Sequence, residues 1–111
     1  MSFEILVTDS FEKSLKKIAK KHRSIKGDLK LLITQLLENP RLGKPLGKDC
    51  YKIRLVISSK GKGKSGGARI ITFLKLVNNK IFLLDIYDKS DKSSLTNKEL
   101  KILISQIDVI K

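Results

Sequence analysis

Residues 69–87 read RIITFLKLVNNKIFLLDIY. Two runs dense in Ile, Leu, Val and Phe flank the pair Asn78 and Asn79, and asparagine is a residue that tight turns favour. The preceding residues 50–58 read CYKIRLVIS and alternate in polarity, with Lys52 and Arg54 on one face of the strand. Together these segments predict an antiparallel meander of three strands.

The flanking segments predict the other elements. Residues 3–7 alternate as a short half-buried strand, and two apolar stripes at helical spacing follow, the second stopped by Pro40. Residues 39–49 hold both prolines and two glycines, which favours a loop. Thr96 and Glu99 form a capping box that begins a C-terminal helix. We therefore expect an α+β fold, in which an N-terminal strand and a helical hairpin pack on a twisted, mainly antiparallel four-stranded sheet.

The distribution of charge indicates a phosphate-rich partner. Residues 50–84 contain no acidic residue but eight cations, and the whole chain carries a net charge of +13. Residues 59–69, SKGKGKSGGAR, form a cationic glycine-rich loop between two strand-like segments. Nucleic acid is the leading partner, although charge alone does not identify which polyanion is bound.

Length and cysteine content give the class of protein. A chain of 111 residues with 41% hydrophobic content predicts a single domain over residues 1–111. The single cysteine, Cys50, has no partner for an internal disulfide and is expected to be a buried strand thiol. Because no apolar run reaches membrane length and no signal peptide is recognisable, we expect a cytoplasmic protein without membrane contact.

Several sequence features that could indicate nucleotide binding, a metal site or nucleophilic catalysis lack support from their context. Gly63, Lys64 and Ser65 resemble the end of a phosphate-binding P-loop, but the segment leads into a strand rather than a helix. No His, Asp or Glu spacing predicts a metal site, and no cofactor is expected. His22 is the only histidine, and its position predicts a helix-end or packing role. The serines have no evident base partner.

The remaining candidate is the cluster of Lys52, Arg54 and Arg69. Lys52 and Arg54 share a strand face, and a paired neighbouring strand can place Arg69 beside them. One interpretation is a solvated outer face. The other is a site for RNA cleavage, in which arginine stabilises the charge on the scissile phosphate, a lysine exchanges protons, and the adjacent 2′-hydroxyl is the nucleophile.

The chain resembles the RelE/ParE superfamily of bacterial toxin-antitoxin toxins, most closely the HigB-like branch. The resemblance rests on CYKIR at residues 50–54, the glycine-lysine loop, GGARII at residues 66–71 and IFLLDIYDK at residues 81–89. It extends over nearly the whole length and implies a RelE-like, microbial RNase-type fold. It also implies a metal-independent endonuclease that cuts messenger RNA on the ribosome and is silenced by a cognate antitoxin, expected to be a helix-turn-helix protein.

The resemblance also implies roles for individual residues. Arg69 stands at the position of the family's phosphate-clamping arginine, and Lys52 and Arg54 at its strand cations. Ser90 and Thr96 stand where RelE has a further arginine and a catalytic tyrosine, so the general acid and base are unassigned. The predicted catalytic residues are Lys52, Arg54, Arg69, Lys89 and Lys92, and those predicted to bind RNA or the ribosome are Lys60, Lys62, Lys64 and Tyr87.

Two alternatives stay open at this point. A ParE-like toxin would inhibit DNA gyrase without cutting RNA, and the cationic cluster favours cleavage over this function. A nucleic-acid-binding relative without activity is the second alternative, because the arginine and the tyrosine of RelE are absent.

Overall fold

The computed structural model describes residues 2–60, 67–92 and 94–107. Within them the chain forms three α-helices, five strands and a short 3-10 turn. In chain order the elements are β1 (Glu4–Val7), α1 (Asp9–Lys21), α2 (Ile25–Glu38), β2 (Lys44–Gly47), β3 (Cys50–Leu55), η1 (Ser58–Lys60), β4 (Ala68–Lys75), β5 (Lys80–Asp88) and α3 (Asn97–Ser105). The α+β class and the predicted helices are confirmed. None of the described helices is long and apolar enough to cross a membrane.

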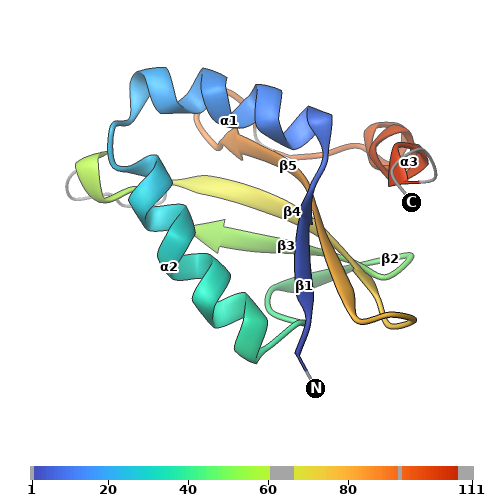
Figure 1. The fold of residues 1–111 in the computed structure, drawn as a ribbon. Helices are drawn as coiled ribbons and strands as arrows, with labels where there is room; N and C mark the ends of the chain where they lie inside the picture. Colours follow the sequence, from blue (N-terminus) through green and yellow to red (C-terminus); the bar gives the residue numbers. More distant parts are fainter. Residues whose placement is uncertain (1, 61–66, 93, 108–111) are drawn as a thin grey trace.

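The strands form one mixed sheet in the order β1-β5-β4-β3-β2 (Figure 1). β1 runs parallel to β5, and the other neighbours are antiparallel. The predicted meander is β3-β4-β5, and the turn between its last two strands has Asn78 and Asn79 at positive φ.

The prediction of four strands is wrong by one, because β2 lies in the segment expected to be a loop. Pro45 weakened the strand pattern, but a proline is tolerated on an edge strand, and β2 is the edge of this sheet. Lys48 and Asp49 adopt positive φ values of 54° and 63° and turn the chain tightly into β3. The result is an additional hairpin beside Lys52.

The helices cover the two faces of the sheet unequally. α1 and α2 pack on one face, over a core that includes Ile53, Ile70 and Ile86. α3 packs on the opposite face, against Phe82 and Leu84 among others. Figure 1 shows the helical hairpin along one side of the sheet and α3 near one end of it. On this second face Cys50, Ile71 and Phe82 are buried, whereas Arg54 of β3 is exposed.

Capping fixes where α1 and α3 begin. Thr8, which is buried, accepts a hydrogen bond from the backbone of Phe11, so the N-cap of α1 is Thr8. The predicted capping box is present at α3, where Thr96 and Glu99 bond to each other's backbone amides.

Candidate nucleic-acid interface

A row of three residues crosses the sheet on the face that carries α3. Arg54 of β3 pairs with Arg69 of β4, and Arg69 pairs with Tyr87 of β5. Residues opposite each other in a ladder share a face, so these side chains lie next to one another. The Lys89 backbone amide donates to the Gly67 carbonyl at 3.0 Å, which continues the pairing past the end of β5.

A groove of about 420 Å³ opens beside this row and is almost entirely cationic. Among the described residues, no carboxylate lines it, and the lining consists of Gly43, Lys44, Lys52, Arg54, Arg69 and Lys89. We call this the cationic groove. It brings together four of the five residues predicted to be catalytic, from β3, β4 and the end of β5. Like charges collect there although they repel, which is the arrangement expected of an anion site.

Lys44 was missed by sequence reasoning because it lies in the segment predicted to be a loop. In the structure it pairs with Lys52 across β2 and β3. Gly43 lies beside it with φ +104°, and a Cβ atom there would lie 2.5 Å from the Lys52 carbonyl oxygen. A glycine is therefore needed where the chain enters the hairpin against β3.

Arg69 differs from the other cations of the groove because it is buried, with 6% of its surface exposed. Its Nη1 donates to the Ala68 carbonyl at 3.2 Å. Arg54 is exposed, whereas Lys52 and Lys89 are half-buried. A buried guanidinium held by its surroundings is already oriented before a ligand arrives, and this is a requirement for stabilising developing charge.

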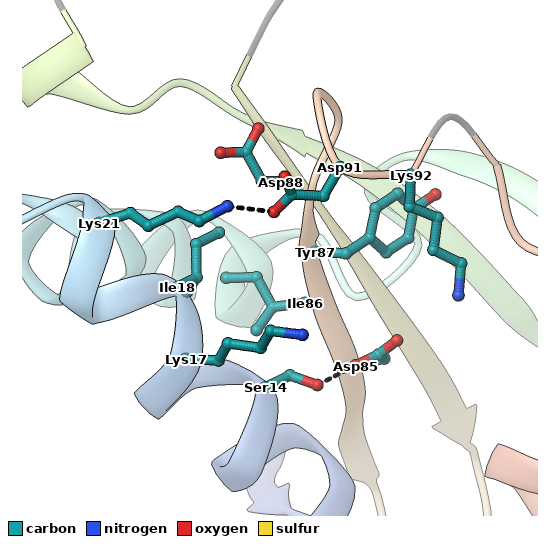
Figure 2. A pocket seen from close by; sticks show the side chains of 10 residues that line it. All are labelled: Ser14, Lys17, Ile18, Lys21, Asp85, Ile86, Tyr87, Asp88, Asp91 and Lys92. Atoms are coloured by element: carbon teal, nitrogen blue, oxygen red, sulfur yellow. Dashed lines mark hydrogen bonds and ion pairs between the residues drawn. The ribbon is translucent and has the colours of Figure 1, made fainter.

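Lys92 lies outside the cationic groove. Its Nζ forms an ion pair with Glu99 at 2.7 Å and lies 5.4 Å from the centre of the Tyr87 ring. That ion pair and the Thr96 backbone amide lower the pKa of Glu99 to about 2. Lys92 instead lines a separate pocket of about 280 Å³ between α1 and the end of β5 (Figure 2).

Tyr87 is 8% exposed and belongs to the core beneath α3. Burial raises the pKa of its phenol, against the opposing influence of Arg69 and Lys92. Its hydroxyl is buried and has no hydrogen-bond partner within the part of the chain that the structure describes. Stacking of an RNA base on the ring would require rearrangement, and the packing role is the one the structure presents.

The lysine loop is described only at its beginning. Lys62 and Lys64 lie outside the described residues, and Lys60 is described only as the last residue of η1. The start of the loop is fixed by Asp28, which accepts bonds from the backbone and hydroxyl of Ser58 at 2.9 and 2.6 Å. Burial opposes ionisation of Asp28, but the bonds from Ser58 and Ser24 outweigh it and lower the pKa.

The expectations for two further residues, His22 and Cys50, are met. His22 caps the C-terminus of α1, as predicted for a helix-end residue. Cys50 is 1% exposed, and burial raises the pKa of its thiol to about 11. In the described residues, no group of three His, Cys, Asp or Glu side chains is placed to hold a metal ion.

The fold and the groove define a small basic α+β protein with an open groove lined by cations. The family described as RelE toxin of the RelE/RelB toxin-antitoxin system matches residues 10–107, so the chain belongs to this toxin family. Two solved structures share its fold. A mutant of E. coli toxin RelE in the free state is 20% identical, covers 96% of this chain and 94% of its own, and has a TM-score of 0.59. A chain of the intact E. coli RelBE toxin-antitoxin complex is 23% identical, covers 78% of this chain and 95% of its own, and has a TM-score of 0.56.

Proposed function

We propose that this toxin is a ribosome-dependent endonuclease that cleaves messenger RNA and thereby arrests translation in the bacterial cytoplasm. The cationic groove is the observation that carries the proposal, because its four strand-borne cations are anchored on a rigid sheet around one open cavity. Membership of the RelE family and the HigB-like sequence features support the same activity. No metal or cofactor takes part in the proposed reaction.

The reaction is a transfer within the RNA strand. The 2′-oxygen attacks the adjacent phosphorus, a 2′-O–P bond forms and the P–O5′ bond breaks. The 2′-hydroxyl loses its proton to a base, and the departing 5′-oxygen gains one from an acid. Arg69 and Arg54 stabilise the additional negative charge on the phosphate oxygens as it develops. Lys52 and Lys89 line the same cavity and are the proposed proton carriers.

A cognate antitoxin is the proposed protein partner. The E. coli relative is known from an intact complex with its antitoxin. A protein with a net charge of +13 attracts an acidic segment, and a segment lying in the cationic groove would exclude RNA from it. Whether the antitoxin is also a helix-turn-helix protein is a separate prediction from the resemblance.

Primer extension on translated messages after induction of the toxin tests the proposal. We expect discrete cuts within codons, and no such cuts with the Arg69→Ala variant. DNA breaks and filamentation with intact messages would instead identify a gyrase inhibitor of the ParE type. Growth arrest without either effect would contradict both activities.

A further inference from the structure

At the end of β5 lies a buried polar cluster that the proposed reaction does not use. Asp88 is 4% exposed, and its Oδ2 lies 2.7 Å from Nε2 of His22 at the C-terminus of α1. Its Oδ1 accepts bonds from the backbone amide and the hydroxyl of Ser90 at 2.9 and 2.7 Å. A buried carboxylate is tolerated only when its oxygens are paired in this way.

The same residue also organises the turn that follows. The Asp88 carbonyl accepts the backbone amides of Asp91 and Lys92 at 2.9 and 3.2 Å. Asp88 is thus bonded through its carboxylate to α1 and through its carbonyl to the next turn. These contacts fix the backbone on both sides of Lys89, whose own amide is held by Gly67.

Successive side chains of a strand point to opposite faces of the sheet. Asp88 faces α1, where it meets His22, and Lys89 lines the cationic groove on the other face. Any rotation of the strand end that released Asp88 from His22 would also turn Lys89 away from Lys52 and Arg69. The contact on the helical face and the cation on the opposite face thus belong to adjacent residues of one stretch of backbone.

From this arrangement we infer that His22 and Asp88 are positioning residues, which hold the end of β5 so that Lys89 points into the groove. Ser90, which stands where RelE has an arginine, closes the Asp88 cluster, and Lys89 supplies the groove with the cation at this end. The inference rests on the proposed function, because it assigns Lys89 a part in the cleavage step.

The test is a double-mutant cycle of His22→Gln and Lys89→Met, measured as the single-turnover cleavage rate on saturated, programmed ribosomes. We expect each single variant to slow cleavage by about tenfold or more, since small misplacements of a reacting group have large effects. The double variant should be no slower than Lys89→Met alone, because His22 acts through Lys89. A multiplicative reduction of the rate in the double variant would overturn the inference.

Lys21→Met is the matched control. It removes the exposed ion pair of Lys21 with Asp91, in the same turn, and such pairs contribute little, so the cleavage rate should stay near wild type. If His22→Gln fails to fold, Ser90→Ala replaces it in the cycle, with the same expectation. If Lys21→Met slows cleavage as much as His22→Gln does, any change in this turn affects the rate. That result would also overturn the inference.

Wild-type protein in the same assay separates the two proposals. Intact messages with wild-type toxin would refute the proposed function itself. The wild type, the two single variants and the double variant would then be compared by their dissociation constants for a short single-stranded RNA. The effects of the two substitutions on RNA binding should again be non-additive. Additive effects on RNA binding would exclude a link between His22 and Lys89.

Discussion

At the scale of single residues, Arg69 is the side chain on which the proposed chemistry depends most. Among the described cations of the cationic groove it is the buried one, and the row across the sheet places it between Arg54 and Tyr87. Its neighbours on both sides restrict its orientation. A residue of this kind is expected to affect the rate of reaction more than the affinity for RNA.

We expect Arg69→Ala to slow single-turnover cleavage on saturated ribosomes by on the order of 100-fold or more. Arg69→Lys keeps the charge but removes the planar fork, so it should recover only part of the rate. Lys75→Ala is the control, because Lys75 is a cation on the same strand but at its far end. Wild-type rates in both Arg69 variants would show that the sheet cations only dock RNA.

Tyr87 provides the second residue-scale prediction. Its buried hydroxyl lacks a partner among the described residues, so Tyr87→Phe should be neutral or should stabilise the fold by up to about 1 kcal/mol. Thermal unfolding measures the effect, and the cleavage rate should not change. A large fall in cleavage with an unchanged melting temperature would place the hydroxyl in the reaction.

At the scale of elements, α3 is attached partly through charge to the segment that follows β5. Lys92 pairs with Glu99 in the capping box of α3, and the pKa of Glu99 lies at about 2 instead of 4.5. The pKa of Glu99 is lower in the folded protein than in the unfolded chain, so the ion pair with Lys92 stabilises the folded state fully above about pH 4.5. This stabilisation disappears as the pH falls towards 2.

We therefore expect the amides of α3 to lose hydrogen-exchange protection between about pH 5 and pH 2, before the central strands do. Glu99→Gln should already show reduced protection near neutral pH and a much smaller change on acidification. If α3 and β4 lose protection together in the wild type, the ion pair has no separate effect on the helix.

Elements with a strong local signal were predicted correctly from the sequence, whereas β2, whose strand pattern contains a proline, and a side-chain contact between distant residues were not. The capping box of Thr96 and Glu99 lies within four residues, and the asparagine turn is local too. β2 was missed because its pairing with β3 outweighs the proline at Pro45. The His22 to Asp88 contact joins residues 66 positions apart, and no spacing rule predicts it.

The same limit applies to the candidate site. Strand alternation was sufficient to group Lys52 and Arg54, and ladder pairing added Arg69. The environment of Lys92 required the structure, which shows its ion pair with Glu99 and its position outside the cationic groove. Lys44 lines the groove because it lies in β2, a strand that the sequence pattern did not predict.

At the scale of the whole molecule, charge is expected to govern association with the ribosome. Lys60, Lys62 and Lys64 add three cations to the sequence between residues 55 and 68. A lysine side chain on its long stem contributes long-range attraction but no fixed geometry.

Replacing Lys60, Lys62 and Lys64 together by Ala should weaken ribosome or RNA binding and flatten its salt dependence, by roughly 0.7 to 0.9 log units of slope for each phosphate that is no longer neutralised. The cleavage step at saturation should be largely unchanged. Titrations at several salt concentrations measure the slope. A variant with the wild-type salt dependence of binding but slow cleavage would show that these lysines take part in the cleavage step.

The pairing of β1 with β5 also determines when the sheet of a newly made chain can be completed. Residues 4–7 cannot pair with their partner strand until residues 80–83 have been synthesised. The groove likewise lacks Lys89 until that residue has been added. Contacts so distant in sequence form late in synthesis. The groove is thus completed late in the synthesis of the chain, and under the proposed function neither RNA cleavage nor capture of the groove by an antitoxin can begin before Lys89 has been added.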